Sequence, residues 1–237
     1  MKAVILAAGR GARMMPLTEN IPKPLLKVKN KTLLDYAIES LPDEVSEVFV
    51  VINYLGEQVV AHINEKYASS RLKFIFLNQE KCSGTAKALE LAKSYLNNDK
   101  FILMFADDIH SKRAIGECAQ YDLAILVKES NNPERFGVIE IKNGDKVLNI
   151  IEKPANPPSN LVNVGVHVLD SRIFNYEAIE HSNGEYYVTD LINQLAKDYP
   201  VKVVKTDMWI PIGYPEDLEK AEDTYRISNI KNKISKI

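Results

Sequence analysis

The order of apolar runs and amphipathic segments constrains the fold of this chain more than any other feature of its sequence. Apolar, β-branched runs at 2–7 and 47–53 flank a segment with helical periodicity at 32–41, which begins with the capping-box pattern of Thr32 and Asp35. The alternation continues through a helix predicted at 56–67, a strand at 72–77, a helix at 84–96 and a strand at 100–106. Repeated β-α-β units predict an α/β fold with a parallel sheet that helices cover on both faces.

The second half of the chain follows a different order. After Asp108, three segments rich in β-branched residues are predicted as strands, at 121–129, 135–154 and 161–170. The KNGD stretch at 142–145 predicts a hairpin turn inside the second of them. Helical periodicity then predicts helices at 171–180, 188–197 and 215–227.

Length and composition indicate one domain with a small partner. The 237 residues, of which 46% are hydrophobic, suffice for a sizeable core, which we expect at 1–227, followed by a basic, frayed tail at 228–237. A net charge of −2 provides no general field for nucleic acid, so an anion must be bound by a local basic cluster. Cys82 and Cys118 are too few for a thiolate metal site. The apolar run at 3–8 falls short of the about 18 residues that a membrane span needs, so we expect a cytoplasmic protein with no membrane partner.

The stretch LAAGRGARMMPLTENIPKPL, residues 6–25, follows the first predicted strand and combines glycines with basic residues and prolines. A glycine-rich turn that leaves a strand of an α/β sheet points its N–H groups into the crevice where phosphates bind. The spacing of Gly9 and Gly11 fits neither a dinucleotide fingerprint nor a Walker loop, because neither a third glycine nor G-K-[ST] follows. Arg13 and Lys23 add positive charge. The stretch therefore predicts an anion site on a loop that its prolines stiffen.

Eight short motifs occur in a fixed order: GRGARMMPLTENIPKPL, NQEKCSGTAKAL, FADDI, RFGVIE, IEKP, NVGVHVLD, GEYYVTD and WIPIGYPEDLEKA. Together they resemble the sugar-1-phosphate nucleotidylyltransferases, also called nucleotide-sugar pyrophosphorylases, over residues 1–222. The resemblance implies a single Rossmann-like α/β domain with a mixed, mostly parallel central sheet flanked by helices. It also implies an enzyme that transfers a nucleoside monophosphate from an NTP to a sugar 1-phosphate and releases pyrophosphate, with UTP or dTTP as the favoured donor.

The resemblance assigns roles on the nucleotide side, where an oxygen of the sugar 1-phosphate would attack the α-phosphorus. Arg13 would hold the triphosphate and the departing pyrophosphate, and Lys23 would neutralise charge at the α-phosphate. Asp107, after the apolar strand FILMFA, would bind Mg²⁺ that the substrate phosphates share. Gln79 would read the edge of a pyrimidine base beside the Gly84 backbone. The nucleotide-binding residues implied by the resemblance are Ala8, Gly9, Gly11, Gln79, Gly84 and Thr85.

The acceptor side is expected from the second half of the chain. By the same resemblance, Lys153 would bind the sugar phosphate and place its nucleophilic oxygen. Glu152 would accept hydrogen bonds from sugar hydroxyls. The expected sugar-phosphate-binding residues are Gly137, Glu152, Lys153, Asn163, Gly165 and Glu185.

One position departs from the family's pattern. Members usually carry an aspartate or asparagine two residues after the tryptophan, whereas this chain has Pro211 two residues after Trp209. We expect Trp209 itself to pack in the core near the site. Proline offers no side-chain ligand, and Asp207 lies about 13 Å along a strand from the expected place. Asp108 or Asp190 would then help to complete the metal site, or phosphates and waters would do so alone.

This departure leaves two alternatives open. One is a nucleotidylyltransferase for another phosphorylated acceptor, such as phosphocholine. The other is a nucleotide-sugar-binding protein with weakened catalysis, which the retention of Arg13, Lys23, Asp107 and Lys153 argues against. The base, the sugar, the pathway and a homo-oligomeric assembly stay open, and we expect no acyltransferase or β-helix domain after the last predicted helix.

Overall fold

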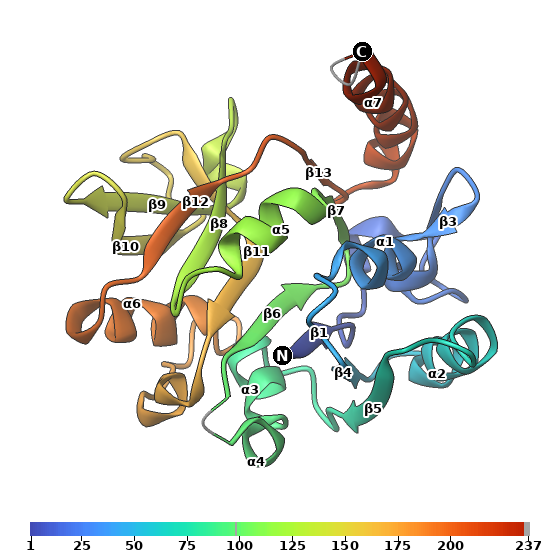
Figure 1. Ribbon diagram of the computed structural model, residues 1–237, viewed down its shortest axis with the longest axis horizontal. Helices are drawn as coiled ribbons and strands as arrows, with labels where there is room; N and C mark the ends of the chain where they lie inside the picture. Colours follow the sequence, from blue (N-terminus) through green and yellow to red (C-terminus); the bar gives the residue numbers. More distant parts are fainter. Residues whose placement is uncertain (98, 235–237) are drawn as a thin grey trace.

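The computed structural model describes residues 1–97 and 99–234, and side chains as far as residue 224 (Figure 1). Within this part of the chain, nine strands form one central sheet. In spatial order they are β5 (Lys73–Asn78), β4 (Glu47–Ile52), β1 (Lys2–Leu6), β6 (Phe101–Phe105), β11 (Leu161–Leu169), β8 (Ala124–Glu129), β12 (Lys202–Lys205), β10 (Lys146–Glu152) and β9 (Gly137–Lys142). Two small sheets pair β2 (Lys27–Val28) with β3 (Lys31–Thr32) and β7 (Asp108–His110) with β13 (Trp209–Pro211).

The central sheet is mixed. β5, β4, β1 and β6 run parallel, and the direction reverses at β11, which pairs antiparallel with both β6 and β8. β8 and β12 are parallel, whereas β10 pairs antiparallel with β12 and β9. The predicted α/β class with a mixed sheet is confirmed. Parallel pairs predominate from β5 to β6 and recur at β8–β12, whereas the reversal at β11 and the pairs of β10 with β12 and β9 are antiparallel.

Helices cover both faces of the sheet, as predicted. One layer consists of α1 (Leu33–Ser40), α2 (Gly56–Lys66) and α5 (Lys112–Cys118), and the other of α3 (Thr85–Glu90), α4 (Lys93–Leu96) and α6 (Val188–Asp198). Successive side chains of a strand point to opposite faces. Accordingly, Ala3 and Ile5 of β1 pack in the apolar cluster that contains α1, α2 and α5, and Val4 packs in the cluster that contains α3, α4 and α6.

Two predicted helices are shorter in the structure. The segment predicted as one helix at 84–96 forms α3 and α4. Of the helix predicted at 171–180, only the 3-10 turn Ser171–Asn175 forms. Asp170 accepts a hydrogen bond from the Arg172 backbone at 3.0 Å and pairs with the Arg172 guanidinium at 2.6 Å. This pairing caps the start of the turn, and the backbone becomes extended at Tyr176, so no longer helix forms.

Other differences concern the end of the chain and the short strands. The helix predicted at 215–227 is α7 (Pro215–Ile234), which continues into the segment expected as a frayed tail, while 235–237 lie outside the described residues. Figure 1 shows α7 standing away from the sheet. The predicted hairpin between β9 and β10 is confirmed, with positive φ at Asn143 and Gly144. Among the described helices, none is long and apolar enough to span a membrane.

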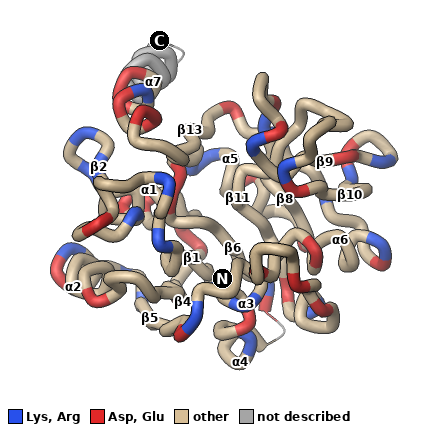
Figure 2. Tube along the Cα trace, turned by 180° about the vertical axis from the view of Figure 1, so that it is seen from behind, with Lys and Arg blue, Asp and Glu red and all other residues tan. Residues whose placement is uncertain are grey.

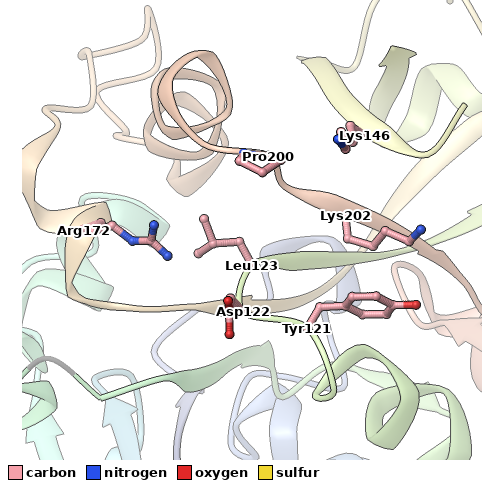
Figure 3. Close-up of a pocket in the computed structure, with 7 residues that line it drawn as sticks. All are labelled: Tyr121, Asp122, Leu123, Lys146, Arg172, Pro200 and Lys202. Atoms are coloured by element: carbon pink, nitrogen blue, oxygen red, sulfur yellow. The ribbon is translucent and has the colours of Figure 1, made fainter. Parts of the chain in front are cut away.

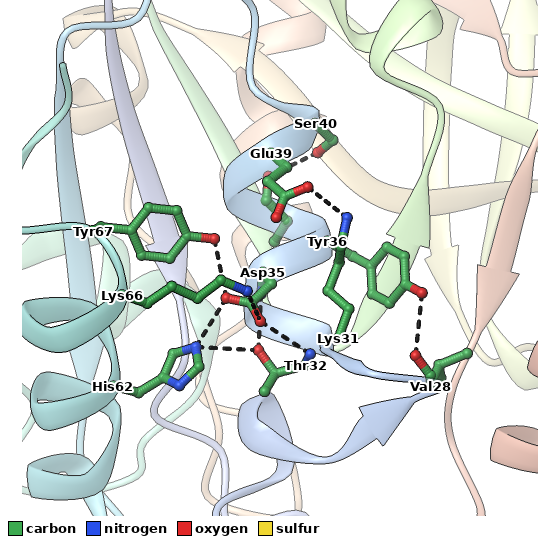
Figure 4. Close-up of polar contacts among 11 residues, drawn as sticks. Val28, Lys31, Thr32, Asp35, Tyr36, Glu39, Ser40, His62, Lys66 and Tyr67 are labelled. Carbon is green, nitrogen blue, oxygen red and sulfur yellow. Dashed lines mark hydrogen bonds and ion pairs between the residues drawn. The ribbon is translucent and has the colours of Figure 1, made fainter. Parts of the chain in front are cut away.

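A buried carboxylate joins α1 to α2 (Figure 4). The predicted capping box is present, because Thr32 Oγ1 accepts from Asp35 N and Asp35 Oδ2 accepts from Thr32 N, both at 3.1 Å. The same carboxylate contacts His62 Nε2 at 2.9 Å, Lys66 Nζ at 2.8 Å and the Tyr67 hydroxyl at 3.0 Å. The side chain of Asp35 is only 2% exposed, so this cluster fixes α2 against α1.

Candidate functional site

The parallel strands bring the first loop and the end of β6 to the same edge of the sheet. Leu6 pairs with Phe105, the last residues of β1 and β6, and Ala106 N donates to the Leu6 carbonyl at 3.1 Å. The loop at 8–13 and Asp107 therefore leave neighbouring strands at their carboxyl ends, where α/β sheets bind ligands. Charges of both signs are spread along the chain (Figure 2), so positive charge at this edge depends on particular residues.

The glycine loop is shaped by close packing with the segment that carries Lys23. Gly11 has a φ of 65°, and a Cβ there would lie 3.0 Å from Lys23 Cβ and 3.1 Å from Thr18 Cγ2. Thr18 Oγ1 donates to the Gly11 carbonyl at 2.9 Å. Glycine at this position lets the loop hold both neighbours without strain. Gly9 is exposed, and a Cβ at this position would have no heavy atom within 4 Å.

Lys23 and Asp107 form an ion pair at this edge, with Lys23 Nζ 2.6 Å from Asp107 Oδ2. The Lys23 side chain is 11% exposed and the Asp107 side chain 37% exposed. Within the described residues, no group donates a hydrogen bond to Asp107 Oδ1. The site thus combines the largely buried ammonium of Lys23 with the free Oδ1 of Asp107, which is available to a ligand.

Arg13 is exposed and lies against an aromatic ring. Its guanidinium carbon is 5.4 Å from the centre of the Tyr214 ring, and that of Arg135 is 5.1 Å from the same centre. Tyr214 directly precedes α7, and Arg135 directly precedes the RFGVIE phenylalanine. Neither was among the residues expected from the sequence. The signal that could have found them is their place inside two of the motifs, RFGVIE for Arg135 and WIPIGYPEDLEKA for Tyr214.

The residues expected at the base contact one another and the start of α6. Gln79 is buried, and its Nε2 donates to the Gly84 carbonyl at 3.3 Å. Gly84 has a φ of 93°, and a Cβ there would lie 2.4 Å from the Tyr186 carbonyl oxygen. Thr85 Oγ1 accepts from Val188 N at 2.9 Å. These contacts join the segment expected to bind the nucleotide to the segment that carries Glu185, whose Oε2 accepts from a neighbouring asparagine at 3.1 Å.

Ala8 connects the first loop to the same region. Its carbonyl accepts a hydrogen bond from Cys82 Sγ at 3.3 Å, and the same sulfur lies 3.3 Å from Asn53 Oδ1. Asn53 Nδ2 in turn donates to the Gln79 carbonyl. These contacts connect the ends of β1, β4 and β5. Cys82 takes part in them although its side chain is exposed.

Glu152 and Gly137 face each other across the β9–β10 hairpin. They are paired residues, and a Cβ on Gly137 would lie 3.2 Å from Glu152 Oε1. Thr189 Oγ1 donates to the same oxygen at 3.0 Å. Burial raises the pKa of Glu152, against the opposing effects of Thr189 and the Lys153 charge. Lys153 follows with a φ of 44° and an exposed side chain, so its ammonium is available to an anion.

Asn163 and Gly165 lie where β11 breaks its register with β8. Gly165 has a φ of 77°, and a Cβ there would lie 2.7 Å from Phe105 Cδ2. Gly165 N donates to Asn163 Oδ1 at 2.9 Å. The register of β11 with β6 pairs Val166 with Met104. Gly165 thus packs against Phe105, the last residue of β6, which stands two residues before Asp107 in the sequence.

The carboxylates considered as second metal ligands are all engaged elsewhere. Asp108 Oδ2 accepts from Trp209 Nε1 at 2.8 Å and its Oδ1 accepts from Ile212 N at 2.9 Å. Burial and the adjacent Asp107 charge raise the pKa of Asp108 to about 7. Asp207 pairs with an arginine at 2.9 Å and Asp190 with a histidine at 2.9 Å. Among the described residues, no group of three His, Cys, Asp or Glu side chains could hold a metal ion.

Trp209 packs in the core, as expected. It is 8% exposed and meets the Phe136 ring edge-on, with 4.9 Å between the ring centres. Its indole N–H is used by Asp108. The tryptophan therefore supports the strand that carries the site.

Comparisons with known sequences and structures show the family and the fold of the chain. The profile described as nucleotidyl transferase matches residues 2–227. The bifunctional protein GlmU of Methanocaldococcus jannaschii is 36% identical over 99% of this chain and 56% of its own length, so the chain spans about half of that relative. The UTP–glucose-1-phosphate uridylyltransferase AglF of Haloferax volcanii is 33% identical over 94% of this chain and 95% of its own.

A solved structure has the same fold as this chain. A Bacillus anthracis protein described as a glucose-1-phosphate thymidylyltransferase superposes with a TM-score of 0.84 at 27% identity, covering 95% of each chain. The profile match covers nearly the whole chain, and it includes the glycine loop, the end of β6 and the β9–β10 hairpin. The chain therefore belongs to the nucleotidyl transferase family.

Proposed function

We propose that the chain is an enzyme that transfers a nucleoside monophosphate from UTP or dTTP to a sugar 1-phosphate and releases pyrophosphate. The observation that carries the proposal is the 2.6 Å contact between Lys23 Nζ and Asp107 Oδ2 beside the glycine loop. Phosphoryl-group chemistry depends on positioning and on stabilising charge on phosphate oxygens, which a cation, a carboxylate for Mg²⁺ and backbone N–H groups supply. The H. volcanii relative, described as a UTP–glucose-1-phosphate uridylyltransferase, supports a pyrimidine nucleotide and a sugar 1-phosphate.

On the triphosphate side, Lys23 and Arg13 divide the work. Lys23 is nearly enclosed, so its charge is weakly screened and suits the α-phosphate, where negative charge rises during attack. Arg13 is exposed on the loop and suits the terminal phosphates that leave as pyrophosphate. Gln79 and the Gly84 segment hold the base.

Mg²⁺ fits this site with few protein ligands. Asp107 offers one carboxylate oxygen that no described group occupies, whereas Asp108 is bound to Trp209 and Ile212. Mg²⁺ is commonly held by one or two carboxylates together with substrate phosphates and waters, so the single free carboxylate is sufficient. When bound, the ion supplies positive charge to the oxygens of the triphosphate.

On the acceptor side, Glu152 and Lys153 orient the sugar 1-phosphate. Glu152 would accept from sugar hydroxyls, and Lys153 would hold the phosphate whose oxygen attacks. The oxygen–phosphorus bond forms as the bond to the β-phosphate breaks, and pyrophosphate departs. An ionised phosphate oxygen needs no base to remove a proton, so the role of the chain is to bring the two anions together.

Pyrophosphate release tests the proposal. The purified chain is incubated with Mg²⁺ and each of UTP, dTTP, CTP, GTP and ATP, in combination with glucose 1-phosphate, N-acetylglucosamine 1-phosphate or phosphocholine. We expect release with UTP or dTTP and a sugar 1-phosphate. Release with phosphocholine alone would exclude the sugar acceptor, and no release with any combination would exclude the transferase and favour a nucleotide-sugar-binding protein.

A further inference from the structure

His167 is a fully buried residue of β11 that the proposed mechanism has not used. It is 0% exposed, lies edge-on to Phe105 with 6.1 Å between the ring centres, and has its Nε2 3.1 Å from Asn163 Oδ1. In a regular strand, two residues four positions apart, as Asn163 and His167 are, would be separated by about 13 Å. The contact exists because β11 breaks register between Asn163 and His167, with Gly165 at a φ of 77°.

The direction of each hydrogen bond here follows from the backbone. Gly165 N is a donor only, so the Asn163 atom that it contacts at 2.9 Å is the amide oxygen. That oxygen is an acceptor only, so His167 Nε2 must carry the proton. His167 Nδ1 is then unprotonated, and within the described part of the chain it is buried without a partner. Burial also lowers the pKa of His167, to about 3, so the ring is neutral.

These two bonds determine what Asn163 presents to the site. Its oxygen is occupied twice, and its Nδ2 has no hydrogen-bond partner among the described residues. Nδ2 is not fully buried, so a ligand can reach it. Asn163 therefore offers two N–H donors and no acceptor, on the segment whose Gly165 packs against Phe105 at the end of β6.

We propose that His167 is a positioning residue: its Nε2–H holds the Asn163 oxygen, so that Asn163 meets the sugar 1-phosphate that it is expected to bind with its Nδ2 donors. The inference rests on the proposed function. It complements Glu152, whose Oε1 accepts a hydrogen bond from Thr189 and whose carboxylate oxygens are acceptors when ionised. The acceptor site then reads its substrate with one donating and one accepting group, and a substrate atom opposite Asn163 must carry a lone pair.

Replacing Asn163 by aspartate tests the polarity directly. Asn163→Asp retains an oxygen for Gly165 and His167 but exchanges the outward donor for an acceptor. We expect the KM for the sugar 1-phosphate to rise at least about tenfold, with the KM for the nucleotide unchanged, because one hydrogen bond is lost and a charge repulsion is added. An unchanged acceptor KM in a folded, active variant would overturn the proposal.

Replacing His167 tests the positioning. His167→Phe keeps a ring against Phe105 and removes the donor, whereas His167→Gln supplies an N–H near the place of Nε2. We expect His167→Phe to raise the acceptor KM about tenfold, His167→Gln to restore most of it, and His167→Phe to add little in an Asn163→Ala background. Val168→Ala, a buried truncation on the same strand, serves as the control, and it should lower thermal stability without changing either KM.

The outcomes separate this inference from the proposed function. If the wild-type chain releases no pyrophosphate with any substrate pair, the proposed function fails. If the wild type is active and His167→Phe raises both KM values equally, or acts independently of Asn163→Ala, the histidine has only a packing role and the inference is wrong.

Discussion

Pro211 stands directly opposite Asp108 in the antiparallel pairing of β13 with β7. The donors to the Asp108 carboxylate, Trp209 Nε1 and Ile212 N, lie on either side of Pro211 in the sequence. Asp108 therefore fastens β13 to the segment that carries Asp107, and its two oxygens are both used for this purpose. The position where the resemblance leads one to expect an aspartate or asparagine thus stands opposite the residue after Asp107, and its proline offers no side-chain ligand.

Arg13→Ala should lower turnover by about 10²-fold or more, because its proposed partner is charge that develops on the leaving pyrophosphate. Its side chain is exposed and contacts the Tyr214 ring, so the midpoint of urea unfolding should change little. Arg10→Ala is the matched control, since Arg10 is an exposed arginine of the same loop that lies over Tyr54 instead. Steady-state pyrophosphate release measures both variants. Equal losses in the two would show a general electrostatic effect and remove the specific role of Arg13.

Lys153→Ala should raise the acceptor KM and lower kcat while nucleotide binding stays close to normal, because the proposed contact is with the sugar phosphate. Lys146 provides the control, because it begins β10, the strand that ends just before Lys153, and lines a hollow at the other end of that strand together with Arg172 and Lys202 (Figure 3). Lys146→Ala removes the same charge from the chain without touching the site. Substrate-saturation curves for both ligands decide the result, and a rise in the nucleotide KM equal to that of the acceptor would indicate a structural role for Lys153.

Gly84→Ala should destabilise the fold by at least about 2 kcal/mol. A methyl group would lie 2.4 Å from the Tyr186 carbonyl oxygen at a φ of 93°, and the contact is with backbone, which cannot move aside cheaply. Gly116→Ala is the control, since this helical glycine has open space around its Cβ position and alanine favours the helix. Urea unfolding should show a loss for the first and a slight gain for the second. A Gly84→Ala variant of normal stability would mean that the Gly84 and Tyr186 segments separate easily.

Asp35 should make stability depend on acid pH. Burial alone would raise the pKa of Asp35, but hydrogen bonds from Lys66, His62 and Thr32 outweigh it and hold the pKa well below its usual value. A depressed pKa contributes stability that is complete above the unfolded value, near 4, and is lost as the pH falls toward the folded value. Asp35→Asn should therefore cost about 3 kcal/mol at pH 7, and the difference from wild type should shrink below about pH 4.

The matched control for Asp35 is Glu39→Gln on the same helix. Glu39 forms an exposed pair with Lys31, and such a pair contributes less than about 1 kcal/mol. Urea titrations between pH 3 and pH 7 compare the three proteins. A constant difference between wild type and Asp35→Asn across this range would show that the ionised carboxylate is not what joins α1 to α2.

The sequence predicts those parts of the site that depend on strand order alone. Lys23 and Asp107 are 84 residues apart, but a glycine turn after one parallel strand and a carboxylate after another must meet at the same sheet edge. The contact of Arg13 with Tyr214 could not be predicted, because it depends on where β13 returns the chain. The bond between Asn163 and His167 depends on the strand break at Gly165, which regular alternation conceals. These contacts arise from tertiary packing, and no local pattern encodes them.

The limits of prediction were similar for the secondary structure. The helix expected at 171–180 has suitable periodicity and an N-cap at Asp170, yet the backbone becomes extended at Tyr176 after one turn. The strands β7 and β13 contain three residues each, too few for alternation to be visible. They are nevertheless the elements that place Pro211 beside Asp108.

Changes at Asp107 and Pro211 test how the metal is held. Asp107→Ala should nearly abolish Mg²⁺-dependent turnover, because the other nearby carboxylate is bound to Trp209 and Ile212. Pro211→Asp should lower the Mg²⁺ concentration for half-maximal rate, because it places opposite Asp108, the residue after Asp107, a carboxylate that Trp209 and Ile212 do not occupy. Pro211→Asn, which lacks the charge, is the control and should have a smaller effect. Mg²⁺ titrations of pyrophosphate release compare all four proteins, and wild-type metal dependence in Asp107→Ala would place the ion elsewhere.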